Sequence, residues 1–245
     1  MEHLIELKNV TKEFKEPRGN LVAVKDINLK INPGEFFMFV GPSGSGKSTI
    51  LRIMSGLEKS YSGKVILGQG VDKKDMAFVF QQFALWPWLT VSQNIEIGLI
   101  ARKVPAPVRA ERVKAELERF GLEKFAHSKP RDLSGGMRQR VGLARAFAVE
   151  PKIIFMDEPF SELDSFTAEE LQKELLRIWV ERKPTIVMVT HIVEDAVELA
   201  DRIAILTPQP GKIEEVVVNH LERPRVRRSE EFYKMEDKLY KLIRP

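Results

Sequence analysis

The 245-residue sequence contains no cysteine, which excludes disulfide bonds and metal sites built on thiolates. Its first residues lack a basic region followed by an apolar run, so we expect no signal peptide and a cytoplasmic setting. Residues 76–95 carry no charge, but Gln81, Thr90 and Asn94 make them too polar to span a bilayer. The net charge of +4 is spread widely, which argues against nucleic acid as the main ligand.

The composition, with 43% hydrophobic and 30% charged residues, is typical of a soluble globular protein. Up to about residue 35, short strand-like runs separated by turns predict an antiparallel sheet. The pattern is helical over 91–148, and strand–helix alternation resumes at Ile153. The sequence shows no internal repeat. It therefore predicts strand-rich segments on both sides of a helical insertion.

A glycine-rich loop follows the apolar run 36–40, which we interpret as a buried strand. Its glycines allow backbone N–H groups to point inward at a phosphate, and the helix that follows favours an anion at its start. Lys47 can reach terminal phosphates, and the Ser48 hydroxyl suits Mg²⁺. A chance glycine-rich turn is the alternative, but the flanking strand and helix argue against it. The predicted phosphate-binding residues are Gly41, Pro42, Ser43, Gly44, Ser45, Gly46, Lys47, Ser48 and Thr49.

Two further motifs carry polar groups next to apolar segments. The apolar run 153–156 is followed by Asp157 and Glu158. This predicts a buried strand that delivers two carboxylates to its C-terminal end, which is where ligands bind in open α/β sheets. A strand end with a helix-capping acid is the alternative. Ser134 with its two following glycines precedes a helical pattern, so a second helix dipole faces an anion. A capped helix start, with glycine for close packing, explains that motif alone but not its occurrence with the others.

These motifs, in this order, resemble those of the ATP-binding cassette (ABC) ATPases over nearly the whole chain. The resemblance implies an α/β fold with a P-loop NTPase (RecA-like) core, an antiparallel β subdomain and an inserted helical subdomain. It implies a single domain over 1–245, in which 1–90 and 149–220 form the β-subdomain and nucleotide-binding core. Residues 91–148 form the helical signature subdomain, and 221–245 form a C-terminal tail.

The resemblance also implies ATP and Mg²⁺ as ligands and assigns catalytic roles. Asp157 orders the Mg²⁺ shell, directly or through water, and Glu158 polarises the attacking water. Gln81 senses Mg²⁺ and the γ-phosphate, so Ser48, Gln81 and Asp157 form the expected metal set. His191 contacts the γ-phosphate. Because a histidine after a strand is usually structural, this role depends on the resemblance alone.

Two more assignments concern the base and a second copy of the chain. Phe14 matches the aromatic residue that stacks on adenine, although it could instead plug the edge of an N-terminal hairpin. Ser134, Gly135 and Gly136 would close on the nucleotide of a second, head-to-tail copy. Asp164 lies in the loop that crosses that interface, where Glu162 replaces the small residue common in the family.

Trp86 and Trp88 flank Pro87 shortly after Gln81, and such residues are costly to expose unless they mark an interaction site. The resemblance places this region beside the groove that receives a membrane permease, while internal packing is the alternative. Four arginines form a basic cluster near the end of the chain that could meet anionic lipid or an acidic partner, or simply stay solvated: Arg223, Arg225, Arg227 and Arg228.

We therefore expect an ATP-hydrolysing, energy-coupling subunit of a membrane importer, peripheral at the cytoplasmic face of the membrane. Its expected partners are a second copy, permease subunits and, indirectly, a solute-binding protein, with no nucleic acid. Residues 83–91, 157–160 and 221–232 resemble those of the nitrate, sulfonate and taurine importer ATPases. The alternative is a soluble ATPase of the same type in cofactor assembly or another non-transport role.

Overall fold

Five consecutive apolar residues form strand β3 (Phe36–Val40), and all five are fully buried. Parallel neighbours lie on both sides, β7 (Thr185–Thr190) and β8 (Arg202–Leu206), and β9 (Ile213–Val218) pairs antiparallel with β8. A parallel strand that is covered on both faces needs apolar residues at every position. This explains why the run lacks the alternation of a half-exposed strand.

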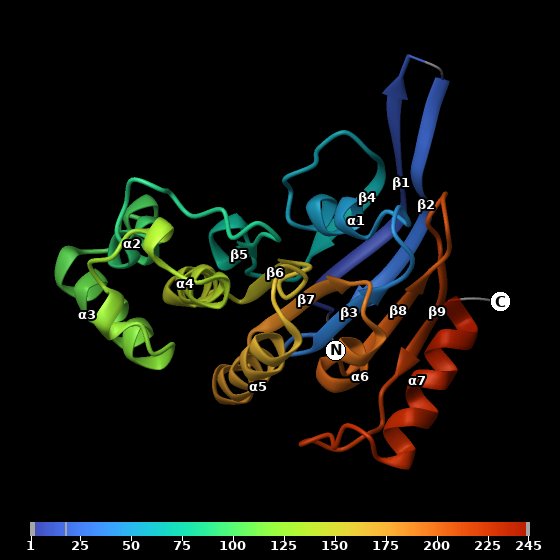
Figure 1. Ribbon diagram of the computed structural model, residues 1–245. Helices are drawn as coiled ribbons and strands as arrows, with labels where there is room; N and C mark the ends of the chain where they lie inside the picture. Colours follow the sequence, from blue (N-terminus) through green and yellow to red (C-terminus); the bar gives the residue numbers. More distant parts are fainter. Residues whose placement is uncertain (1–2, 18, 244–245) are drawn as a thin grey trace. The chain divides into compact units, whose positions relative to one another are not determined.

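The computed structural model describes residues 3–17 and 19–243 (Figure 1). The chain packs as two units, one made of Met1–Lys73 with Lys183–Pro245 and the other of Lys74–Arg182. Each unit is described by itself. The division into subdomains that the sequence suggested remains a prediction.

The first unit also contains a three-stranded antiparallel sheet, in the order β2-β1-β4: β1 (Ile5–Glu16), β2 (Gly19–Ile31) and β4 (Ser62–Leu67). Alternate residues of β1 and β2, such as Ile5 and Ile31, are buried, as expected for a sheet with one covered face. The helices of this unit are α1 (Lys47–Met54), α6 (Val193–Leu199) and α7 (Glu230–Ile243). The structure thus confirms an α/β fold with an antiparallel β subdomain.

The second unit pairs two parallel strands, β5 (Met76–Val79) and β6 (Ile153–Asp157). Its helices are α2 (Val91–Ala101), α3 (Ala106–Arg119), α4 (Gly135–Ala148) and α5 (Ser165–Arg182), and α2 packs against both α3 and α4. Short 3₁₀ helices lie at Lys73–Asp75, Glu123–Phe125 and Pro130–Asp132. Within the described residues, no helix has the length and apolar character that a bilayer span requires.

The basic cluster near the end of the chain is engaged within the first unit. Arg225 is buried and donates from Nη1 to the carbonyls of Val197 and Glu198, both at 2.9 Å, at the end of α6. Arg223 Nη2 donates to Leu199 O, and Arg227 Nε lies 3.4 Å from a Glu198 carboxylate oxygen. Guanidinium groups thus satisfy the last carbonyls of the helix, which carry its negative dipole end.

The interpretation of a solvated tail is therefore wrong for Arg223, Arg225 and Arg227, whereas contact with anionic lipid or an acidic partner stays a prediction. The pKa of Arg225 is lowered to about 10, mainly by burial and in part by the charge of the neighbouring Arg223. At neutral pH the guanidinium is still charged, so its hydrogen bonds to the helix end are charge-assisted.

We predict that Arg225→Ala lowers the free energy of unfolding by about 1–3 kcal/mol, because Glu198 O and Leu221 O lose the donor that Arg225 provides, although Val197 O keeps Asn219. Arg228→Ala is the matched control, since Arg228 is exposed and its removal should change stability by less than about 0.5 kcal/mol. Denaturant unfolding of the intact chain measures both. Equal losses in the two variants would show that Arg225 does not hold the end of α6.

Candidate functional site

The glycine-rich loop joins β3 to α1 in the first unit, as predicted from the sequence. Gly46 is the N-cap of α1 with φ of 83°, in the left-handed region that favours glycine. A Cβ on Gly46 would lie 2.3 Å from Val24 Cγ1, and one on Gly211 would lie 2.0 Å from Ser45 O. Two neighbouring backbones therefore approach this loop so closely that side chains have no room there.

The Lys47 ammonium lies against the loop that precedes it. Lys47 is only 5% exposed, and its Nζ donates to Gly41 O at 2.8 Å and to Pro42 O at 2.9 Å. The hydroxyl of Ser45 is buried without a hydrogen-bond partner, and a Cβ on Gly44 would meet no atom within 4 Å. A buried cation, an unsatisfied hydroxyl and open space at the start of a helix fit a bound phosphate group.

His191 leaves the sheet beside this loop. Val40 of β3 pairs with Thr190 of β7, so Gly41 and His191 follow neighbouring parallel strands at the same sheet edge. Thr190 Oγ1 accepts a hydrogen bond from Ile192 N at 3.1 Å and lies 3.4 Å from a carboxylate oxygen of the buried Asp195. The turn that carries the exposed His191 is therefore fixed from both sides.

Phe14 lies on β1 opposite Leu21 of β2 and is 37% exposed. The buried Lys12 places its ammonium 4.6 Å from the ring centroid and donates to Ser60 O at 2.6 Å. The ring is thus held by a cation and still reaches solvent, which is what stacking on a base requires. Its role with adenine stays a prediction.

In the second unit, the predicted acidic pair comes directly at the end of a buried strand. Asp157 is the last residue of β6 and is buried, and Glu158 follows with a left-handed φ of 45°. A non-glycine residue in this region costs about 1–3 kcal/mol, and such strain concentrates at functional sites. Since Val79 of β5 pairs with Met156 of β6, Gln81 leaves the same edge of this strand pair.

Ser161 links Gln81 to Glu158, a role that the sequence reasoning missed. Gln81 Nε2 donates to Ser161 Oγ at 3.2 Å, and Ser161 Oγ donates to Glu158 O at 3.0 Å. The amide nitrogen of Gln81 is thus engaged within the unit, and the role of Gln81 with a metal ion stays a prediction. A serine three residues after a strand-terminal acid is the only sequence signal, and turn serines are too common for it to decide.

The predicted signature residues and Asp164 meet at the starts of α4 and α5. Ser134 caps α4 by accepting from Met137 N at 3.2 Å, and a Cβ on Gly136 would lie 2.5 Å from Thr167 Cγ2. Asp164 accepts from Thr167 N at 3.0 Å and from Thr167 Oγ1 at 2.7 Å, and these two bonds lower the pKa of Asp164. Ser134 thus caps α4, and Gly136 allows close packing against Thr167. The ligand roles of these residues stay predictions.

Trp86 and Trp88 are 44% and 63% exposed, with ring centroids 5.2 Å apart in an edge-to-face arrangement. The buried Asn94 holds their segment: its Oδ1 accepts from Trp86 N at 2.8 Å, and its Nδ2 donates to Trp86 O and Leu89 O, both at 3.2 Å. The alternative that both tryptophans pack internally is therefore wrong. The structure presents an aromatic pair to solvent on a well-held segment.

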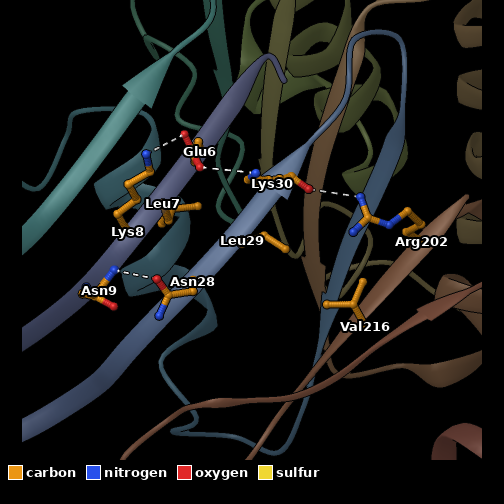
Figure 2. Close-up of a pocket in the computed structure, with 9 residues that line it drawn as sticks. All are labelled: Glu6, Leu7, Lys8, Asn9, Asn28, Leu29, Lys30, Arg202 and Val216. Atoms are coloured by element: carbon orange, nitrogen blue, oxygen red, sulfur yellow. Dashed lines mark hydrogen bonds and ion pairs between the residues drawn. The ribbon is translucent and has the colours of Figure 1, made fainter. Parts of the chain in front are cut away.

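The first unit also contains a groove of about 550 Å³ (Figure 2). Its lining includes Lys8 and Lys30, which share Glu6 at 3.3 and 3.7 Å, and Arg202, which lies 3.1 Å from Glu35. None of the predicted site residues lines it. Because its cations already have carboxylate partners, we assign no ligand to this groove.

The predicted residues thus divide between the two units. The loop 41–49, Phe14 and His191 belong to the first, and Gln81, the pair 157–158, Asp164 and the segment 134–136 belong to the second. Within each unit the chemical groups follow the carboxyl ends of buried parallel strands or the starts of helices. Fold and residues together define a nucleotide-binding cassette.

Comparison with known proteins agrees with this class. Residues 24–161 match the family model described as ABC transporter. The chain is 43% identical to an uncharacterized ABC transporter ATP-binding protein of Methanocaldococcus jannaschii, over 98% of this chain and 91% of that protein. It is 39% identical to an aliphatic sulfonates import ATP-binding protein of Bacillus cereus, over 96% and 94%. It is 40% identical to a nitrate import ATP-binding protein of Synechocystis, over 98% and 95%.

A solved dimeric structure of an ATP-binding cassette, in a post-hydrolysis state bound to ADP and Pi, superposes with a TM-score of 0.78 at 38% identity, covering 89% of this chain and all of that one. The chain belongs to the ABC transporter family, and it is an ATP-binding ATPase of that family. This confirms the resemblance stated from the sequence, including its likeness to the nitrate and sulfonate importer group.

We predict that Ser161→Ala lowers the turnover of ATP by about 2–10-fold with little change in KM, because one hydrogen bond that orients Gln81 is worth about 0.5–1.5 kcal/mol. Ser161→Thr, which keeps the hydroxyl, should restore most of the rate. Ser165→Ala, on an exposed serine nearby, is the control and should behave like the parent. Steady-state phosphate release measures all three, and an unchanged turnover in Ser161→Ala would contradict the link.

Proposed function

We propose that this ATPase is the energy-coupling subunit of a membrane importer and that it uses Mg²⁺. The observation that carries the nucleotide chemistry is the buried Lys47 ammonium beside the glycine-rich loop. The observation that carries import is the match along nearly the whole chain to import ATP-binding proteins. Lys47 and the loop N–H groups bind the phosphates, and Phe14 stacks on adenine.

The donor set fits Mg²⁺, which prefers oxygen ligands and keeps several waters. Ser48 offers a hydroxyl, Asp157 a buried carboxylate, and Gln81 the amide oxygen that its bond to Ser161 leaves available. When bound, Mg²⁺ supplies positive charge beside the phosphate oxygens. Glu158 accepts a proton from the water that attacks the γ-phosphorus, and His191 donates a hydrogen bond to a γ-phosphate oxygen.

We infer that two copies of the chain act together, each closing on the nucleotide of the other. Ser134, Gly135 and Gly136 form a helix start without a lysine of its own, so they suit the phosphates of a nucleotide held by another copy. A relative solved as a dimer with ADP and Pi supports this arrangement. Asp164 accepts a hydrogen bond from Thr167, which lies against Gly136. Asp164 would then lie near the contact between copies.

The permease partner and the solute complete the proposal. The exposed pair Trp86 and Trp88 is the surface we assign to permease subunits, and this places the chain at the cytoplasmic face of the membrane, peripherally. A solute-binding protein would act on the other side of the same transporter. The solute is nitrate, a sulfonate such as taurine, or a similar small solute, by likeness to the import proteins. A role in cofactor assembly would leave the aromatic pair unexplained.

We predict that Glu158→Gln lowers ATP hydrolysis by about 10²–10⁴-fold while ATP binding persists, because it removes the general base and leaves the phosphate loop intact. The variant should accumulate as an ATP-bound dimer, which light scattering detects. Glu170→Gln changes an exposed carboxylate of α5 and should hydrolyse ATP like the parent. Parental hydrolysis by Glu158→Gln would show that Glu158 is not the base.

We predict that replacing Trp86 and Trp88 together by Ala abolishes copurification with the permease and uptake of nitrate or sulfonates, while the ATP affinity of the isolated chain changes less than about twofold. Val180→Ala, on an exposed apolar residue of α5, is the control and should keep both properties. Persistent permease binding in the double variant would contradict the assigned surface. Normal uptake of both solute classes by cells that lack this chain would contradict the solute assignment alone.

A further inference from the structure

The loop after Gln81 contains two successive residues in the left-handed region, Phe83 with φ of 52° and Ala84 with φ of 45°. Ala84 N donates to Gln82 O, which closes a three-residue turn around Phe83. A turn of this kind with positive φ is rare and strained, and neither residue is a glycine. An interaction elsewhere in the unit must therefore stabilise this conformation.

Arg145 of α4 provides that interaction. Its Nη1 donates to Ala84 O at 2.7 Å and its Nη2 donates to Phe83 O at 3.0 Å. Successive carbonyls point to opposite sides in an extended chain, whereas two left-handed residues turn them the same way, so one guanidinium can bind both. Arg138, on the same helix, lies 5.3 Å from the centroid of the Phe83 ring.

The dependence is mutual. Arg145 is largely withdrawn from solvent, and this burial lowers its pKa, as expected for a cation in a poorly hydrated place. A half-buried guanidinium needs acceptors, and among the described residues Arg145 donates to the two loop carbonyls. If the loop extended, Arg145 would lose at least one of them. Conversely, without Arg145 the carbonyls of Phe83 and Ala84 would lose this donor.

The same loop is held at its other end by α2, through the hydrogen bonds of Asn94 to Trp86. The helix that carries Arg145 begins at the cap residue Ser134, about three turns, or roughly 16 Å, earlier. One continuous helix thus carries a predicted nucleotide contact at its start and the anchor of the Gln81 loop further along. No proline interrupts α4, and its one glycine beyond the first turn is Gly142, three residues before Arg145.

We propose that Arg145 is a positioning residue: it fixes the strained Phe83–Ala84 turn to α4, so that Gln81 and the aromatic pair move with that helix. This deepens the proposed function and rests on it only for the roles of Gln81 and the tryptophans. A displacement of Ser134 at the contact with the partner's nucleotide would then reach both of them without a change in the loop itself.

The first test uses the intact chain without permease. Arg145→Gln should raise the rate of chymotryptic cleavage between residues 83 and 88 at least tenfold, and Arg145→Lys, which keeps the charge and one hydrogen bond, should fall in between. Acrylamide should quench tryptophan fluorescence more strongly, a change that reports on Trp86 and Trp88 because Trp179 is 1% exposed. Arg140→Gln, which breaks an ion pair of the same helix with Glu174, is the matched control and should behave like the parent.

The second test separates positioning from general loosening. Arg145→Gln should lower kcat about tenfold with KM for ATP within about twofold, because the phosphate loop belongs to the other unit. Ala84→Gly added to Arg145→Lys should recover protease resistance, since glycine adopts the left-handed conformation without strain. Parental cleavage and kcat in Arg145→Gln, or equal effects in Arg140→Gln, would overturn the proposal. A parent chain without ATPase activity would refute the proposed function instead, and cleavage would still decide the role of Arg145.

Discussion

The chemistry of this protein depends on the complete burial of its parallel strands. Strands β3, β7 and β6 are covered on both faces, so the polar residues that follow them can reach a ligand only at the strand ends. Register then decides which groups become neighbours: Val40 pairs with Thr190, and Val79 pairs with Met156. The phosphate loop and His191 follow from the first pairing, and Gln81 with the acidic pair follows from the second. A slip of one residue in either register would move these groups apart.

Guanidinium groups supply the second level of order. Arg225 satisfies the end of α6, the helix that follows His191, and Arg145 satisfies the turn that follows Gln81. Arg225 binds carbonyls in the last turn of a helix, and Arg145 binds carbonyls of an irregular turn. In both cases the planar guanidinium fixes direction as well as distance. The turn at Phe83 and Ala84, which lies outside the helices and strands, is thereby held in a defined position. This explains how loops that carry function stay ordered without being part of a sheet.

The sequence was sufficient for the features that depend on local pattern. The run 36–40, the glycine-rich loop and the Asp157–Glu158 strand end were all predicted, because burial and backbone freedom leave a direct mark on residue type. It was not sufficient for Ser161, Arg145 or the C-terminal arginines, whose partners are distant or belong to another element. An arginine is compatible with solvent, lipid or a carbonyl, and only the fold decides among these. The ligand roles of Phe14, His191 and Asp164 rest on family likeness, since their positions permit those roles without requiring them.

Gly211 shows how far the phosphate loop extends beyond its own motif. Its backbone pairs with Ala23 and Lys25 of β2, and its missing Cβ would fall on the carbonyl of Ser45. The backbones of three chain segments therefore lie in contact at Gly211, where any side chain would displace the glycine-rich loop. In genetic terms, position 211 belongs to the nucleotide motif although it lies far from it in sequence. A motif defined only by consecutive residues therefore underestimates the number of positions at which a mutation would damage this ATPase.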